Sequence, residues 1–155
     1  MYIQQKEVDG MNYDFASMPC YGVKARWSLA ALAVFYDRFF KTCGITGRQY
    51  TYLYTISINE GCSTSELAEI IKVDRSTMTR NLRTLMNRGL VVDLKAPDER
   101  NSKLSLTEEG KLVTAKAVRQ WNKAQDCMKE RFGEQELAVI DRVLEEIGSL
   151  GNYKI

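Results

Sequence analysis

The chain has 155 residues, of which 45% are hydrophobic and 27% are charged, so its composition suits one folded domain and excludes an intrinsically disordered protein. It contains no histidine, the commonest metal ligand and general base in proteins, and Ser-His and Cys-His catalysis are therefore excluded within this chain. The sequence also lacks a Gly-rich phosphate loop and a metal-ligand cluster. We therefore expect neither an enzyme nor a protein with a bound cofactor or metal.

The net charge of +2 is distributed unevenly. Between Lys72 and Lys103 the chain has eight basic residues against four acids, whereas between Asp126 and Leu150 it has seven acids against three basic residues. The middle of the chain can therefore attract phosphate groups, and the C-terminal part cannot.

No stretch approaches the roughly 20 apolar residues of a membrane helix, and the N-terminus lacks a signal-peptide pattern, so we expect a cytoplasmic protein without a membrane partner. The cysteines have no C-x-x-C spacing, and in the cytoplasm we expect free thiols at all four positions: Cys20, Cys43, Cys62 and Cys127.

The first predicted element follows residues 1–18, which are polar, lack a clear period and are interpreted as a tail or a loosely docked arm. From Tyr21 to Thr42 we predict a long helix that ends at Gly44. Its apolar side chains surround most of its circumference, which indicates burial on more than one side. In a chain of this size, a partner subunit is the simplest surface against which the second side of the helix could be buried. The alternative is a central core helix in a monomer.

Two shorter helices should follow, each opened by a pair with capping-box spacing: Thr46 with Gln49, and Ser63 with Glu66. The first helix extends to about Asn59, and the second covers 63–71. A brief turn then leads to Asp74, which is suited to cap the next helix because its carboxylate can accept from the free N–H groups of the first turn. Two helices joined this tightly predict a helix-turn-helix unit.

The helix that begins at Asp74 and ends at Gly89 has two distinct faces. Its apolar stripe consists of Met78, Leu82, Leu85 and Met86. Its polar face consists of Ser76, Thr79, Arg80, Arg83 and Asn87. This face has no carboxylate beyond the cap and suits a duplex groove, where arginine pairs with guanine edges or phosphates and hydroxyls reach either.

After Gly89 the period becomes alternating, first at Val92 and Leu94 and then at Leu104 and Leu106, which predicts two strands. The residues between them, 96–102, form a loop with Arg100 near its tip. A helix followed by such a hairpin describes a winged helix-turn-helix. Thr107 then caps another long helix, which Gly133 interrupts, and a final amphipathic helix ends near residue 150.

Two stretches of the chain resemble the MarR family of transcriptional regulators. DERNSKLSLTEEG, from Asp98 to Gly110, is similar to the family's wing signature, D-x-R-x-x-x-L-x-L-T-x-x-G, and SELAEIIKVDRSTMTRNLRTLMNRGLV resembles its helix-turn-helix. The resemblance covers nearly the whole chain from about Cys20. It implies a mainly α fold with a small β-hairpin wing, in which 19–155 form one domain. The terminal helices, 19–44 and 107–155, would build a two-fold dimer around the winged helix-turn-helix of 45–106.

The resemblance implies a dimeric, sequence-specific DNA-binding transcriptional regulator. A dimer would place two recognition helices about 34–36 Å apart on double-stranded DNA, so the operator should be a near-palindrome. Repression by occlusion is the usual consequence, although activation stays open. The expected helix contacts are Arg75, Ser76, Thr77, Thr79, Arg80 and Arg83. By resemblance, Arg100 of the wing enters the minor groove and Asp98 helps to orient it. The simpler interpretation of each residue is a solvated helix face or a charged hairpin tip.

Two switches are compatible with the sequence. Cys20 lies at the start of the first helix, where the dipole can raise thiol reactivity, and some peroxide-sensing relatives carry a reactive cysteine near this region. The simpler interpretation is a small apolar residue. The other switch is a small phenolic or aromatic effector, bound in a pocket between the dimer helices and the DNA-binding part. The candidate lining residues are Trp27, Tyr36, Tyr52 and Trp121, although aromatics at helical spacing are more often plain core.

The main alternative function is a winged-helix module that binds a protein and not specific DNA. Such a module should present an apolar or acidic recognition face, whereas Arg75, Arg80 and Arg83 make this face basic. A salt-dependent affinity for DNA distinguishes the two functions.

Overall fold

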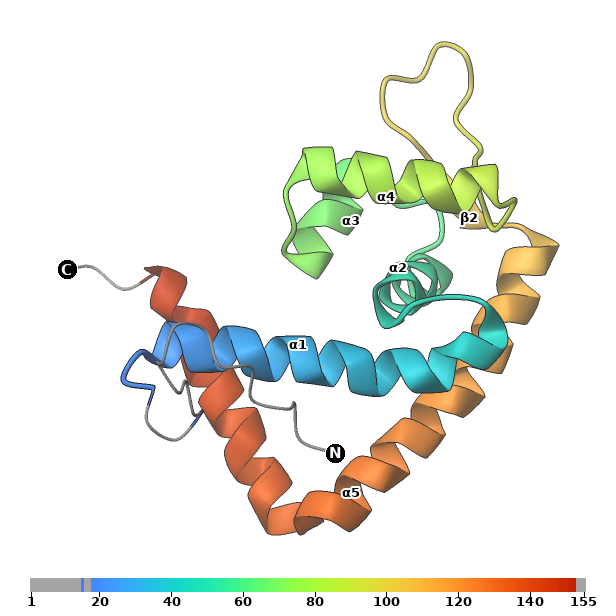
Figure 1. The fold of residues 1–155 in the computed structure, drawn as a ribbon. Coiled ribbons are helices and arrows are strands. Elements are labelled where there is room, and N and C mark those ends of the chain that lie inside the picture. Colours follow the sequence, from blue (N-terminus) through green and yellow to red (C-terminus); the bar gives the residue numbers. More distant parts are fainter. Residues whose placement is uncertain (1–14, 16–17, 153–155) are drawn as a thin grey trace, which may run out of the picture.

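The computed structural model describes residue 15 and residues 18–152, and it has the predicted mainly helical fold with one small β-hairpin. The elements in chain order are α1 (Tyr21–Phe40), η1 (Lys41–Cys43), α2 (Gly47–Ile58), α3 (Thr64–Ile71), α4 (Arg75–Asn87), β1 (Val91–Asp93), β2 (Leu104–Leu106), α5 (Glu108–Ser149) and η2 (Leu150–Asn152). The predicted N-terminal arm lies outside the described residues except for Phe15 and Met18. Figure 1 shows α2, α3, α4 and the hairpin gathered into one lobe, with α1 and the long α5 as two arms beside it.

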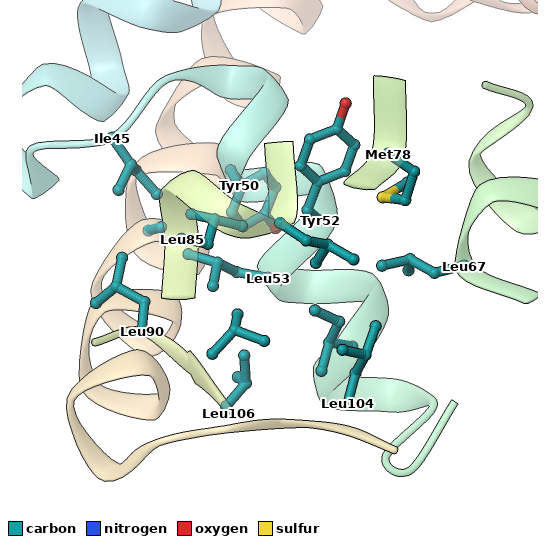
Figure 2. Close-up of a cluster of buried hydrophobic side chains, with 14 of the residues drawn as sticks. Ile45, Tyr50, Tyr52, Leu53, Leu67, Met78, Leu85, Leu90, Leu104 and Leu106 are labelled. Carbon is teal, nitrogen blue, oxygen red and sulfur yellow. The ribbon is translucent and has the colours of Figure 1, made fainter. Parts of the chain in front are cut away.

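The hydrophobic core lies inside this lobe, where α2, α3, α4, the hairpin and the first turns of α5 meet (Figure 2). Its most enclosed side chains, with no exposed surface, include Leu53, Leu67, Met78, Leu85 and Leu104. Burial of one such side chain contributes about 1.5–3 kcal/mol, so the lobe has its own source of stability. This core holds the buried face of α4 in place and leaves its other face in solvent.

The arm helix α1 contributes little to that core. Within one chain it buries only Phe40, whose ring stacks on Tyr50 with centroids 4.6 Å apart. The helix ends two residues earlier than predicted, because η1 tightens the last turn before Gly44, which has a φ of +67°. The burial on more than one side that the sequence predicts for this helix is therefore not met within a single chain.

Both predicted capping boxes are present. Thr46 Oγ1 accepts from the Gln49 N–H at 3.2 Å, and Gln49 Oε1 accepts from the Thr46 N–H at 3.1 Å. At the start of α3, Ser63 Oγ accepts from the Glu66 N–H at 3.2 Å, and Glu66 Oε2 accepts from the Ser63 N–H at 2.7 Å. The bond from the Ser63 backbone, followed by that from its hydroxyl, lowers the pKa of the Glu66 carboxyl. The side chains themselves therefore determine where α2 and α3 begin.

The two strands are antiparallel, with Val91 opposite Leu106 and Asp93 opposite Leu104. Val91 is buried, whereas Val92, which belongs to the alternating pattern in the sequence, is 36% exposed. The alternation therefore located the strand but not its buried side. The reason is that the chain leaves α4 through the core, so Leu90 and Val91 are buried in succession.

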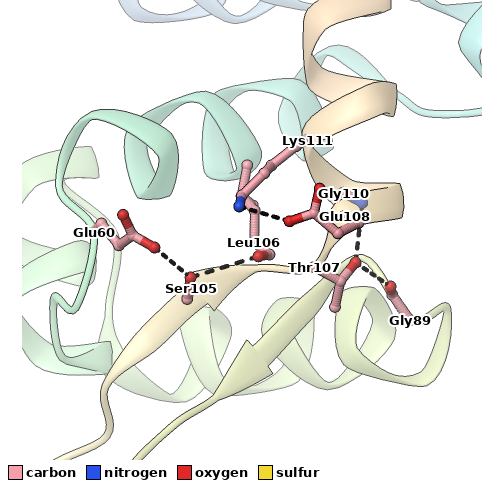
Figure 3. A network of polar contacts seen from close by, with 8 residues as sticks. All are labelled: Glu60, Gly89, Ser105, Leu106, Thr107, Glu108, Gly110 and Lys111. Atoms are coloured by element: carbon pink, nitrogen blue, oxygen red, sulfur yellow. Dashed lines mark hydrogen bonds and ion pairs between the residues drawn. The ribbon is translucent and has the colours of Figure 1, made fainter.

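The first turn of α5 packs unusually close to the end of the α4–β1 connection (Figure 3). The Thr107 hydroxyl donates to the Gly89 carbonyl at 2.6 Å and accepts from the Gly110 N–H at 3.0 Å. The Thr107 N–H donates to the Leu90 carbonyl at 3.2 Å. A Cβ atom at Gly110 would lie 2.0 Å from that same Leu90 oxygen, so only glycine allows this approach.

Gly133 divides α5, as the sequence predicts, but it does so by a kink in one long helix and not by a loop between two helices. Its φ of +80° and ψ of 165° lie in a region that is essentially restricted to glycine. Figure 1 shows the sharp bend in the middle of the C-terminal arm. The kink turns the second half of α5 back toward α1.

Replacement of Gly110 by alanine should destabilise the protein by about 1–3 kcal/mol, because the new methyl group must displace the Leu90 backbone. Urea-induced unfolding at a fixed protein concentration measures the change. Gly148→Ala is the matched control, since Gly148 is also helical and a Cβ atom there meets nothing within 4 Å. A Gly110→Ala variant as stable as the control would contradict this account of the contact.

Candidate nucleic-acid interface

The helix α4 has the two faces that the sequence predicts. Met78, Leu82 and Leu85 are buried against the core. The opposite face is exposed and consists of Ser76, Thr79, Arg80, Arg83 and Asn87. Between the two faces, the Asn81 side-chain amide donates to the Tyr52 hydroxyl at 2.9 Å. This bond joins α4 to α2 and sets how the helix is rotated about its axis, and sequence patterns did not reveal it.

Asp74 organises the start of this helix. Its Oδ1 atom accepts from the Thr77 N–H at 2.8 Å, which confirms the predicted N-cap, and also from the Ser76 hydroxyl at 2.5 Å. Its Oδ2 atom accepts from the Thr77 hydroxyl at 2.6 Å. These three bonds, with that from the Ser76 hydroxyl as the largest contribution, hold the pKa of the Asp74 carboxyl well below its usual range. The cap is therefore a carboxylate at any pH at which the protein works.

The arginines at the start and on the exposed face of α4 have no partner among the residues that the structure describes. Among the residues that the structure describes, no hydrogen bond or ion pair involves the guanidinium of Arg75, Arg80 or Arg83. Arg88 differs, because it donates to the Gly44 carbonyl at 2.8 Å and to Gln49 Oε1 at 3.3 Å. It connects the end of α4 to the α1–α2 junction, and so it is not one of the basic residues available to a ligand.

The wing, residues 94–103, carries Arg100 and Asp98, both of them exposed. No hydrogen bond or ion pair joins these two residues in the described part of the chain, so the orienting role of Asp98 stays a prediction. Glu99 instead organises the loop, because its carboxylate accepts from the Ala96 N–H at 2.8 Å and pairs with the Lys103 ammonium. The bond from Lys103 is the main reason that the pKa of the Glu99 carboxyl lies below its usual range.

A hydrogen-bonded junction ties the base of the wing to the helix-turn-helix. The Ser102 hydroxyl oxygen accepts from the Thr64 N–H at 2.7 Å and lies 2.8 Å from the Thr64 hydroxyl. Two backbone bonds reinforce it, from Gly61 N–H to the Leu104 carbonyl at 2.8 Å and from Leu104 N–H to the Cys62 carbonyl at 2.9 Å. The wing and the start of α3 therefore move as one unit.

The structure thus brings the predicted contact residues onto two neighbouring elements of one lobe, the exposed face of α4 and the wing beside it (Figure 1). A helix that fits a major groove beside a basic loop is the geometry of a winged-helix DNA reader. Within the described residues, no group of three or more His, Cys, Asp or Glu side chains could hold a metal ion, and no helix is long and apolar enough to cross a membrane.

Comparisons with known proteins identify the family. The MarR family model matches residues 44–100 of the chain. An uncharacterized HTH-type transcriptional regulator of Bacillus subtilis (strain 168), YybA, is 34% identical over 111 residues, which cover 70% of this chain and 73% of the relative. The chain belongs to the MarR family. MarR-family members are transcriptional regulators and not enzymes, which confirms the two corresponding predictions from the sequence.

Solved MarR-family structures share the fold. The DNA complex of the M. tuberculosis transcriptional regulator MosR is 32% identical to this chain, with a TM-score of 0.72 over 86% of this chain and 94% of that one. A mutant MarR from E. coli complexed with operator DNA is 20% identical to this chain. Its TM-score is 0.74, over 81% of this chain and 91% of that one. The predicted winged helix-turn-helix is therefore confirmed.

The contacts of Thr107 and Gly110 give a physical reason for the last part of the MarR wing signature. The threonine caps α5 and holds the Gly89 carbonyl, and the glycine allows α5 to approach Leu90. The leucines that precede them, Leu104 and Leu106, are core residues. This part of the signature thus attaches the wing to the lobe, whereas Asp98 and Arg100 lie in solvent.

The candidate effector residues of this MarR-family chain differ in burial, and their common pocket stays a prediction. Tyr52 is 2% exposed within the core, whereas Trp121 is 39% exposed. Trp27 is half-buried, and the Tyr36 hydroxyl accepts from the Gln125 amide at 3.1 Å. Two hollows of about 680 and 370 Å³ are lined by residues of the helix-turn-helix and the wing, and by none of these four aromatics.

All four cysteines are free, but their surroundings differ. Cys20 is exposed and precedes the first turn of α1 without capping it through its side chain. Cys43, Cys62 and Cys127 are half-buried. Burial, with a smaller contribution from the Glu66 carboxylate, raises the pKa of the Cys62 thiol and so disfavours its reactive thiolate. Among the four, Cys20 is the thiol that an oxidant reaches most easily in a single chain.

Replacement of Ser102 by alanine should loosen the wing, since the Thr64 N–H loses its acceptor. We expect faster hydrogen exchange at Thr64 and a loss of about 0.5–1.5 kcal/mol in the free energy of unfolding. Ser65→Ala is the control, because Ser65 is exposed one position further along α3. Unchanged exchange at Thr64 would show that the backbone bonds alone hold the junction.

Proposed function

We propose that the protein is a homodimeric transcriptional repressor that binds a near-palindromic operator through α4 and the wing. The observation that carries this proposal is the exposed α4 face. Its arginines lack partners in the part of the chain that the structure describes, and Asp74 orders the hydroxyls and backbone of its first turn. Unpaired guanidiniums at the surface suit phosphates and guanine edges. The DNA complex of MosR, a relative 32% identical to this chain, supports duplex DNA as the partner. We propose that the protein acts in the cytoplasm.

The dimer is supported by the apolar surface of the two arms. Leu29 and Val34 of α1 are 68% and 55% exposed in a single chain, and Leu144 and Ile147 beyond the kink of α5 are 55% and 47% exposed. These large apolar side chains on the two arms are the surface that a partner subunit would cover. A second copy that covers these arms would also satisfy the burial that the sequence predicts for α1. We propose 19–44 and 107–155 as the dimerisation regions around the DNA-binding unit of 45–106.

Selection of bound sequences from a random duplex library at near-physiological salt tests the proposal directly. A near-palindrome with two half-sites separated by one helical turn is expected for two copies of α4 on one face of the duplex. If no sequence is enriched, the alternative gains support, a winged-helix module that binds a protein partner. The exposed arginines of α4 argue against that alternative, because they make its recognition face neither apolar nor acidic.

Replacement of Arg80 by alanine should weaken operator binding by about 1–3 kcal/mol and relax the preference at one base position. Replacement of Arg100 should weaken binding as well, but it should relax sequence preference less. Both variants should remain dimers. Titration of labelled operator at several salt concentrations measures affinity and salt slope. Arg119→Ala is the control for loss of one positive charge, since Arg119 is exposed on α5 outside the helix-turn-helix. Affinity equal to that of the control in either variant would overturn the corresponding contact.

We propose that release from DNA follows either from oxidation of Cys20 or from a small phenolic or aromatic effector. Either event must favour one spacing between the DNA-binding lobes of the two subunits over another. A ligand that binds both spacings equally well does not shift the equilibrium between them. The exposure of Cys20 supports the first route. The second route needs a pocket other than the two hollows beside the helix-turn-helix and the wing, since none of the four candidate aromatics lines either of these.

Treatment with peroxide separates these routes. If Cys20 is the switch, operator affinity of the parent should fall after oxidation, whereas Cys20→Ser should keep its affinity. Cys127→Ser, which removes a half-buried thiol, should respond as the parent does. Equal sensitivity of the parent and Cys20→Ser would exclude the redox route through this residue and leave the effector route.

A further inference from the structure

The hydroxyl groups at the start of α4 already donate their protons to acceptors within the protein. The Ser76 hydroxyl donates to Asp74 Oδ1 at 2.5 Å, and the Thr77 hydroxyl donates to Asp74 Oδ2 at 2.6 Å. One turn later, the Thr79 hydroxyl donates to the Arg75 carbonyl at 2.8 Å. A hydroxyl has one proton and two lone pairs, so each of these groups presents only lone pairs to a molecule that approaches the helix.

The bond at Ser76 is the strongest of those made by the exposed hydroxyls. It is short and its acceptor is an ionised carboxylate, whereas Thr79 donates to a neutral carbonyl. Asp74 cannot release Ser76 without cost, because the same oxygen caps the helix through the Thr77 N–H. Thr77 itself is half-buried, which leaves Ser76 as the exposed hydroxyl whose proton is most firmly held.

A hydroxyl in this state distinguishes among the groups on DNA. Phosphate oxygens accept hydrogen bonds and cannot donate them, so Ser76 without a free proton has nothing to offer a phosphate. In the major groove, guanine presents two acceptors and thymine one acceptor and a methyl group, whereas adenine N6 and cytosine N4 carry donor amines. Only adenine and cytosine can therefore donate to Ser76 Oγ.

We propose that Ser76 is a specificity-determining hydrogen-bond acceptor that reads the exocyclic amine of an adenine or cytosine in the operator, and that Asp74 is the positioning residue that holds it in this state. The arginines of the same face supply the opposite polarity, since a guanidinium can only donate and therefore selects guanine edges and phosphates. The exposed face of α4 thus presents a hydrogen-bond acceptor at its first turn and hydrogen-bond donors at Arg80 and Arg83. This inference rests on the proposed DNA-binding function.

The first experiment locates the base that Ser76 reads. The parent, Ser76→Ala and Arg80→Ala dimers are each used to select from the same random duplex library. Ser76→Ala should lose preference at one base pair of the operator, and Arg80→Ala should lose preference at a different pair. Each base pair carries one major-groove amine, on its adenine or its cytosine, and the next experiment tests that group. Thermal unfolding of both variants confirms that the fold is intact.

The second experiment removes only the amine. At the position located by Ser76→Ala, adenine is replaced by purine, or cytosine by pyrimidin-2-one, each of which lacks the exocyclic amine. Parent affinity should fall roughly three- to tenfold, as expected for one lost hydrogen bond, while Ser76→Ala should bind both duplexes equally. The same analogue at a position that Ser76→Ala does not affect is the control for altered duplex stability.

The third experiment tests Asp74 separately from folding. Asp74→Ser keeps a good N-cap for the Thr77 N–H, but a neutral serine hydroxyl lacks the negative charge that holds the Ser76 proton on the capping oxygen. Ser76 can then also donate, so the base pair that Ser76 reads should be preferred roughly three- to tenfold less over the other pairs at that position. A helix that merely frayed would weaken binding to all sequences alike.

The outcomes separate the two levels of the proposal. If the parent enriches no sequence, the proposed DNA-binding function fails. If a near-palindrome is enriched and Arg80→Ala changes it, the function stands, and the inference on Ser76 is judged alone. A Ser76→Ala variant that weakens all sequences equally or changes no preference, or parent affinity unchanged by the analogue, would each overturn it. An unaltered base preference in Asp74→Ser would overturn the role of Asp74.

Discussion

The approach of α5 to the Leu90 carbonyl is the constraint on which the architecture depends. The connection after α4 meets the first turn of α5 through backbone groups, with the Thr107 hydroxyl on the Gly89 carbonyl and Gly110 against Leu90. No side chain separates the recognition helix's exit from the arm helix that follows. The direction in which α5 leaves the lobe is therefore closely coupled to the position of the end of α4, because closely packed backbone contacts deform little.

A second set of bonds connects the arms to the lobe from the other side. Arg88, just beyond α4, donates to the Gly44 carbonyl at the α1–α2 junction, and Lys116 of α5 donates to the Thr42 carbonyl in the same turn at 2.7 Å. The end of α4 is thus held by contacts that also involve both arms. A change in the angle between the arms would act on this junction. The junction therefore offers a physical route from the proposed switch to the spacing of the two α4 helices in the proposed dimer.

The polar chemistry of the proposed DNA-binding surface follows from which groups the fold leaves unpaired. Arg88 donates to the Gly44 carbonyl, and Lys103 pairs with Glu99. Other basic residues are exposed without partners in the described part of the chain: Arg75, Arg80, Arg83 and Arg100. The hydroxyls show the reverse, since their protons are satisfied internally. The exposed side of α4 from Ser76 to Arg83 therefore presents donors and acceptors in separate places. Such a separation suits a groove in which bases differ in donor and acceptor pattern.

Local features of this protein were predictable from its sequence because they arise between residues three or four positions apart. The capping boxes of Thr46 and Ser63, the Asp74 cap, the Gly133 break and the two faces of α4 all belong to this class. The family signature added the wing and its order in the chain. Other features were decided only by tertiary packing: the buried side of β1, the capture of Arg88, and the bonds from Asn81 to Tyr52 and from Ser102 to Thr64. These partners lie 29 to 44 positions apart, and no local period specifies which donor meets which acceptor once the lobe closes.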